Sequence, residues 1–120
     1  MQTDLYIDGN WVPSQSAQRF DVMNPATEDV IASVASADVF DADLALNAAS
    51  TAMQEWAARS PRDRSEVLRK AWELMTARLP EFARLITLEN GKANADAMGE
   101  AIYAAEFFRW FAEEAVRVDG

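Results

Sequence analysis

Short apolar runs separated by polar residues occupy the first 36 residues, and this pattern predicts β-structure. Residues 5–7 and 11–12 are apolar and flank Asp8-Gly9. Asp-Gly is a strong signal for a tight turn, because glycine accepts a positive φ angle. Further runs at 20–22 and 30–35 have the length and the β-branched content of strands. We therefore expect short strands, the first two of them joined as a hairpin.

Helical periodicity follows, and it predicts four helices. The first runs from about Val39 to Ala58, with Ser36 or Asp38 as alternative N-caps. Ser60-Pro61-Arg62-Asp63 is typical of the start of a second helix. Pro80 opens a short third helix, and Gly91 suits its C-cap. Asp41 and Asp43 are interpreted only as charges that favour a helix start.

The fourth helix, over about 95–117, carries an apolar band too wide for one neighbouring layer to cover. Such a helix is usually packed between two neighbouring elements, and this chain is expected to supply one of them. We therefore expect the chain to be one incomplete domain. Its fold class is α+β, with N-terminal strands in 1–36 and a helical part in 37–120. The band consists of two stripes, Met98, Ile102, Ala105, Phe108, Ala112 and Ala115, and Tyr103, Phe107 and Trp110.

Composition narrows the classes of partner. The 20 acidic and 11 basic residues give a net charge of −9, which disfavours nucleic acid and anionic membrane surfaces. No apolar stretch approaches the roughly 20 residues that span a bilayer, and the N-terminus lacks the pattern of a signal peptide. A cytoplasmic protein is the expectation.

Cysteine and histidine are both absent, which removes the usual nucleophile, the usual base and the usual zinc ligands. The four glycines lie far apart and form no phosphate-binding loop. The chain is therefore expected to contain no catalytic and no cofactor-binding residue.

The order of the segments LYIDGNWV, FDVMNPATEDVIASVASAD, LITLENGK and GEAIYAAEFFRWFAEEAVRVDG resembles the N-terminal part of aldehyde dehydrogenases. The last segment is most similar to the succinate-semialdehyde dehydrogenase branch. The resemblance implies an α/β fold of which this chain is part of the cofactor domain. It also implies an enzyme that oxidises an aldehyde to an acid with NAD or NADP through a cysteine found further along the chain.

The resemblance also implies two local roles. A monovalent cation, Na⁺ or K⁺, would be held by Glu89 and by the backbone carbonyls of Val22 and Met23, since alkali cations prefer oxygen ligands. That role would explain why an acid lies at a helix C-terminus, where the helix dipole disfavours it. Glu100 and Phe107 would lie in the wall of the substrate tunnel. The alternatives are an ordinary helix end at 89–92 and plain packing of the fourth helix.

Three interpretations of the whole chain follow. It is an N-terminal fragment of a succinate-semialdehyde-type dehydrogenase, inactive alone, or a non-catalytic interaction module derived from the same family, or a small independent enzyme. The missing Cys and His argue against the third. Under the first, the aldehyde is the partner of the intact enzyme. The fragment itself is expected to self-associate through the exposed apolar surface of the helix over 95–117.

Overall fold

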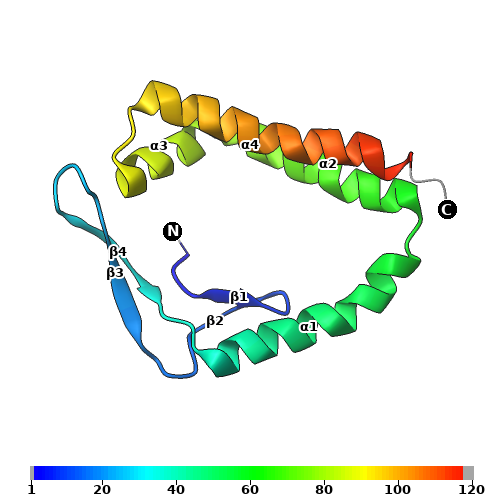
Figure 1. Ribbon diagram of the computed structural model, residues 1–120, viewed down its shortest axis with the longest axis horizontal. Helices are drawn as coiled ribbons and strands as arrows, with labels where there is room; N and C mark the ends of the chain where they lie inside the picture. Colours follow the sequence, from blue (N-terminus) through cyan, green and yellow to red (C-terminus); the bar gives the residue numbers. More distant parts are fainter. Residues whose placement is uncertain (1, 118–120) are drawn as a thin grey trace. The chain divides into compact units, whose positions relative to one another are not determined.

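Two antiparallel hairpins form the first part of the molecule in the computed structural model, which describes residues 2–117 (Figure 1). The first hairpin pairs β1 (Leu5–Ile7) with β2 (Asn10–Val12), and the second pairs β3 (Arg19–Met23) with β4 (Val30–Ala35). Both hairpins coincide with the short apolar runs, so the predicted strands are confirmed.

The turn of the first hairpin has the geometry that its sequence predicts. Asp8 and Gly9 both adopt positive φ angles, 50° and 77°, as the two central residues of a type I′ turn require. Tyr6 and Trp11 are paired across the two strands, and their ring centroids lie 5.0 Å apart. The turn thus fixes a register in which the two aromatic side chains meet.

The second hairpin is irregular at one point and anchored at its base. The register shifts between Val22 and Met23, which marks a β-bulge. Near the base, the Arg19 guanidinium donates to the Asp4 carboxylate at 2.8 Å, to the Thr3 hydroxyl at 2.7 Å and to the Ser33 carbonyl at 2.7 Å. Arg19 therefore ties the N-terminal segment to both strands of this hairpin.

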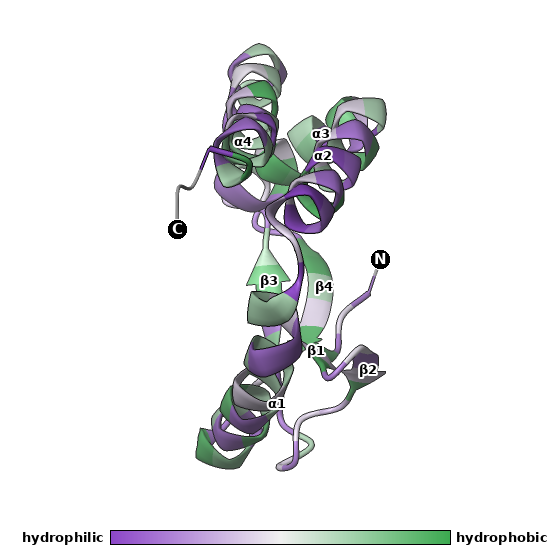
Figure 2. Ribbon diagram, turned by 90° about the vertical axis from the view of Figure 1, so that its right-hand side faces the viewer, coloured by the Kyte–Doolittle hydropathy of each residue, from purple (hydrophilic) through white to green (hydrophobic). Residues whose placement is uncertain are grey.

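Helix α1 (Val39–Ala58) begins and ends where the sequence predicts. Asp38 is the N-cap, because its Oδ1 accepts from the backbone N–H groups of Phe40 and Asp41 at 2.8 and 3.1 Å. Apolar and polar residues alternate along α1 (Figure 2), and residues of both kinds are exposed. The one buried residue described for α1 is an acid, Asp41.

Asp41 does more than charge the helix start, so that interpretation was too narrow. Its Oδ2 accepts from the N–H of Asp38 at 3.0 Å, and its Oδ1 accepts from the N–H of Gln15 at 3.1 Å. The first bond completes a reciprocal capping arrangement, and the second joins the 13–18 loop to the helix. The bond from Asp38 lowers the pKa of Asp41 most strongly, and burial opposes it.

Three further helices complete the described chain: α2 (Pro61–Ala77), α3 (Leu79–Asn90) and α4 (Asn94–Ala115). Ser60 caps α2 by accepting from the N–H of Asp63 at 3.1 Å. Gly91 ends α3 in the left-handed conformation, with φ of 73°. Both helix boundaries agree with the signals in the sequence.

The chain divides into two compact units, Met1–Ala57 and Ala58–Gly120. In the second unit α4 packs against both α2 and α3, which lie beside it (Figure 1). The buried stripe of α4 consists only of small residues, Ala97, Ala101, Ala105 and Ala112. Small side chains let helix backbones approach closely, and one result is a 2.6 Å bond from the Ser65 hydroxyl to the carbonyl of Ala112.

This buried stripe corrects the one expected for the fourth helix. Ala105 and Ala112 belong to both, but Ile102 and Phe108 are exposed. Ile102 lies to one side of the alanine stripe, whereas Phe108 shares the face of the alanines. Phe108 remains 37% exposed and lines a groove together with Leu68 of α2.

The fold class is α+β, short strands followed by four helices. The division into 1–36 and 37–120 of one incomplete domain stays a prediction, although the change from strand to helix falls between Ala35 and Val39. Within residues 2–117, no helix is long and apolar enough to cross a membrane.

Candidate functional site

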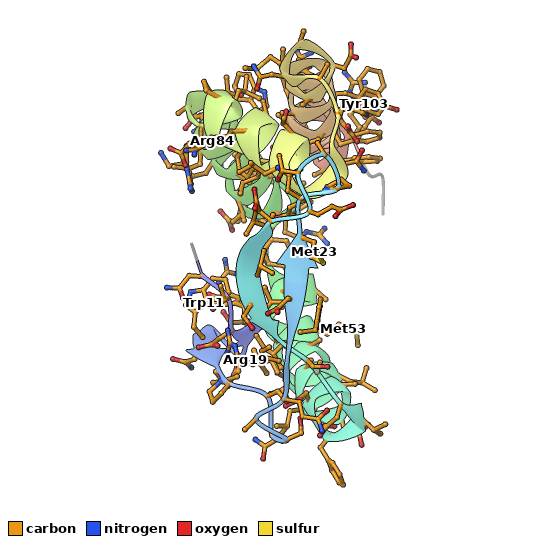
Figure 3. The ribbon with its side chains drawn as sticks, turned by 90° about the vertical axis from the view of Figure 1, so that its left-hand side faces the viewer. Trp11, Arg19, Met23, Met53, Arg84 and Tyr103 are labelled. Atoms are coloured by element: carbon orange, nitrogen blue, oxygen red, sulfur yellow. The ribbon has the colours of Figure 1, made fainter. Side chains whose placement is uncertain are left out.

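The side of α4 that faces away from the alanine stripe carries a row of exposed aromatic side chains. Tyr103, Phe107 and Trp110 are spaced by four and three residues, so they share one face of the helix. They are 66%, 47% and 60% exposed, and the labelled Tyr103 projects outward from the helices (Figure 3). The rings of Tyr103 and Phe107 meet edge to face, with centroids 4.9 Å apart.

These aromatic residues line a shallow groove of about 330 Å³, together with Glu106 and Phe111. Its surface is apolar apart from one carboxylate at the side. A groove of this size and composition suits a small, mostly apolar ligand or an apolar segment of polypeptide. It is the strongest candidate for a functional site among the described residues.

Glu106 is the charged member of the groove. Its Oε2 accepts from the Arg109 Nε at 2.7 Å, and its Oε1 accepts from the Trp72 indole N–H at 3.3 Å. The bond from Arg109 is the main reason that the pKa of Glu106 lies below its ordinary value. Glu106 thus links α2 to α4 and is held as a carboxylate.

Sequence reasoning did not single out Glu106. The signal available was its spacing of three residues from Arg109, which favours an ion pair on a helix. The contact with Trp72, 34 residues away, had no signal in the sequence.

The two residues expected in a tunnel wall differ in their surroundings. Phe107 lies in the aromatic groove. Glu100 lies nearly two turns before it, where its Oε2 accepts from the Lys92 Nζ at 2.6 Å. This bond raises the pKa of Lys92. Lys92, which comes just after the end of α3, is thus paired with a side chain of α4. The tunnel role of both residues stays a prediction.

The three residues expected to hold a monovalent cation lie in different units. Val22 and Met23 flank the bulge of β3, where a shifted register redirects backbone carbonyls. Glu89 is the penultimate residue of α3, exposed and without an ion pair to any described residue. One carboxylate and irregular carbonyls are suitable donor chemistry for an alkali cation, and the site itself stays a prediction.

Beyond the aromatic groove, we find no grouping of side chains within the described residues that suggests a reaction centre. Among residues 2–117, no cluster of three or more Asp or Glu side chains is arranged to hold a metal ion. The chain contains no Cys and no His, so it offers neither a thiol nucleophile nor an imidazole base. The geometry supports a surface that contacts a small apolar ligand or another segment of polypeptide.

Comparisons with known proteins identify the family. The model of the aldehyde dehydrogenase family matches residues 11–120. A glutarate-semialdehyde dehydrogenase of Pseudomonas putida is 43% identical over 115 residues, which cover 96% of this chain and 24% of that protein. A succinate-semialdehyde dehydrogenase of Paenarthrobacter nicotinovorans is 53% identical over 88 residues, 73% of this chain and 20% of that protein.

Solved structures give the same result for the fold. An NADP-dependent enzyme of Escherichia coli superposes with a TM-score of 0.96 at 37% identity, over 98% of this chain and 24% of that one. The chain thus spans about a quarter of the length of the curated relatives it matches. The chain belongs to the aldehyde dehydrogenase family and corresponds to the N-terminal part of its members.

Proposed function

We propose that the chain is the N-terminal part of an NAD(P)-dependent aldehyde dehydrogenase that oxidises succinate semialdehyde or a similar semialdehyde to the acid. The observation that carries the proposal is the similarity, at 43% and 53% identity, to two enzymes whose substrates are semialdehydes. Both named substrates are aldehydes that end in a carboxylate, so an acidic aldehyde is the proposed substrate class.

The 120 residues alone are inactive in this proposal. A covalent mechanism needs a nucleophile that attacks the aldehyde carbon, and this chain has no cysteine to do so. NAD or NADP would supply the hydride acceptor when bound to the intact enzyme. What this chain would contribute is a wall of the substrate tunnel.

In that wall Phe107 would pack against the aliphatic part of the substrate. Glu100 would lie further along α4 with its charge balanced by Lys92, at 2.6 Å. A balanced pair repels an acidic aldehyde less than a free carboxylate would.

The cation role is proposed for the intact protein as well. Glu89 would supply a carboxylate, and Val22 and Met23 would supply backbone carbonyls, to Na⁺ or K⁺. Support for it is the unpaired carboxylate of Glu89 within the described chain and the bulge at β3.

A second candidate function is a non-catalytic interaction module that binds a partner through α4. The exposure of Tyr103, Phe107 and Trp110 favours it. It differs from the first proposal in needing no further domains for its activity.

The test is a chimera in which this chain replaces the N-terminal quarter of the Pseudomonas putida glutarate-semialdehyde dehydrogenase. We expect NAD(P)H formation with succinate or glutarate semialdehyde at rates within about tenfold of the parent enzyme, and slower turnover of a neutral aldehyde of equal length. The isolated chain and the truncated parent, as controls, should form none. A chimera that is folded and binds NAD(P) but oxidises neither semialdehyde would contradict the proposal and favour the interaction module.

A further inference from the structure

The groove on α4 meets the two parts of the proposed substrate unequally. Succinate and glutarate semialdehydes are short aliphatic chains with an aldehyde at one end and a carboxylate at the other. The aromatic side chains of the groove can cover the aliphatic part. A carboxylate that enters such a groove loses water and needs a hydrogen-bond donor in exchange. A donor in the lining therefore favours an acidic aldehyde over a neutral one.

Two of the five side chains that line the groove carry a donor, the Tyr103 hydroxyl and the Trp110 indole N–H. The two phenylalanines of the lining carry none, and Glu106 is a carboxylate, because the bond from Arg109 lowers its pKa. Tyr103 and Trp110 lie seven residues apart, which is about two turns of helix. The donors thus lie toward opposite ends of the groove, and their surroundings decide between them.

We propose that Tyr103 is a substrate-binding residue of the intact enzyme and that its hydroxyl donates a hydrogen bond to the carboxylate of the semialdehyde. This inference rests on the proposed function and adds a residue that sets the preference for acidic aldehydes. The ring of Tyr103 packs edge to face against Phe107, with centroids 4.9 Å apart, and this contact stabilises the position of the ring. The hydroxyl and the apolar contact with the substrate therefore come from adjoining turns of α4.

The charges around Tyr103 permit an anion to approach it. Two carboxylates lie within one turn of helix, Glu100 and Glu106, and each is paired with a cation. Lys92 binds Glu100 at 2.6 Å, and this bond raises the pKa of Lys92, so the pair remains ionised and neutral overall. A carboxylate at the Tyr103 hydroxyl thus meets balanced charge.

The surroundings of the other donor are less favourable. Three carboxylates lie within one turn of Trp110, those of Glu106, Glu113 and Glu114. Arg109 pairs with the first two and Arg117 pairs with the third. Three negative charges against two positive ones leave one in excess, which repels a substrate carboxylate from the Trp110 end.

The test is Tyr103→Phe in the chimera with the Pseudomonas putida glutarate-semialdehyde dehydrogenase. The substitution removes the hydroxyl and keeps the ring against Phe107. We expect the KM for succinate and glutarate semialdehydes to rise about tenfold and kcat to stay within about twofold, because the bond to the carboxylate is made in the ground state and the transition state alike. Both constants for butanal and pentanal, neutral aldehydes of similar length, should stay within about twofold.

Two further variants separate this role from others. Tyr6→Phe removes the same atom from the first hairpin and should leave the kinetics with all four aldehydes unchanged. Trp110→Phe removes the other donor and should leave the ratio of kcat/KM for acidic and neutral aldehydes unchanged. Loss of the acidic preference in Trp110→Phe instead of Tyr103→Phe would overturn the proposal. Equal losses for acidic and neutral aldehydes in Tyr103→Phe would do so too, since they would indicate packing.

Failure of the proposed function would give a different result. A folded chimera that oxidises neither semialdehyde contradicts both the function and the role of Tyr103. A chimera that oxidises the semialdehydes equally well with Tyr103 and with Phe at this position overturns the role of Tyr103 alone.

Discussion

Each of the two units of the molecule is stabilised internally by a different kind of interaction. In the first unit, Met1–Ala57, the buried residues among those described are Ala35 and two polar residues, Ser14 and Asp41. In the second unit, the buried residues described are all alanines, Ala83 on α3 and four on α4. The first unit thus depends on directed hydrogen bonds to a carboxylate, and the second on close steric contact between helices.

The two units also differ in their balance of acidic and basic residues. The first unit has nine acidic residues and one basic residue, Arg19, whereas the second has eleven acidic and ten basic residues. In the second unit the charges form ion pairs along the helices, as Arg69 does with Glu66 and Glu73. In the first unit, the Arg19 guanidinium and the buried Asp41 carboxylate make side-chain hydrogen bonds to residues far away in the sequence.

The largest effect is expected from filling the close helix contact of the second unit. Ala101→Leu adds three carbon atoms where Ala101 is 3% exposed, and overpacking of this kind costs about 2–3 kcal/mol. Urea unfolding followed by tryptophan fluorescence measures the loss. Ala104→Leu, an exposed position on the same helix, is the control and should change stability by less than about 0.5 kcal/mol. Equal effects of the two variants would show that the alanine stripe is not a close contact.

The corresponding change in the first unit is Asp41→Asn. The amide keeps the shape of the side chain but replaces one acceptor oxygen with a donor, which then faces a backbone N–H of Asp38 or Gln15. We expect the melting temperature of this unit to fall by roughly 5–10 °C. Asp43→Asn, at an exposed position two residues later, should have little effect. Similar melting temperatures for both variants would mean that the buried carboxylate is dispensable.

Low pH should destabilise the first unit through Asp41, a buried carboxylate that has no equivalent among the described residues of the second unit. The folded pKa of Asp41 lies below its ordinary value, so its contribution to stability is complete above the unfolded pKa of about 4. That contribution is lost as the pH falls through the folded pKa. Melting of the original chain between pH 6 and pH 2.5 should therefore show an acid-dependent loss that Asp41→Asn reduces. An unchanged pH dependence in the variant would assign the acid sensitivity to other carboxylates.

The smallest changes in stability are expected from substituting two glycines of the second unit by alanine, and the two changes should have opposite signs. Gly91→Ala forces alanine into a left-handed conformation with φ of 73° and should cost about 1 kcal/mol. Gly99 lies within α4, and a Cβ added there meets no atom within 4 Å, so Gly99→Ala should stabilise by about 0.5–1 kcal/mol. Thermal melting compares the two, and the same sign for both would contradict the assigned backbone roles.

Local signals in the sequence were sufficient to predict the strands and helices, but not the contacts between them. The bounds of α1, the cap at Ser60 and the left-handed Gly91 depend on neighbouring residues, and all three were predicted. The burial of Asp41 depends on Gln15, which lies 26 residues away, and the sequence offers no sign of that contact. The buried stripe of α4 was misplaced at Ile102 and Phe108, because hydrophobicity favours large residues whereas the helix contact selects small ones.

The same limit applies to the candidate site. The exposed row of Tyr103, Phe107 and Trp110 was predicted from its periodicity, since it forms a stripe separate from the rest of the apolar band. The role of Glu106 was not predicted, because its contact with Trp72 arises only when α2 and α4 pack together.

The central claim is that each unit is stabilised by its own contacts, and amide hydrogen exchange of the original chain and two variants tests it most directly. The account predicts that Ala101→Leu accelerates exchange in 61–115 and leaves the hairpin over 19–35 unchanged. It predicts the reverse for Asp41→Asn. Accelerated exchange throughout 2–117 in both variants would show that the chain unfolds as one cooperative body and would contradict the account.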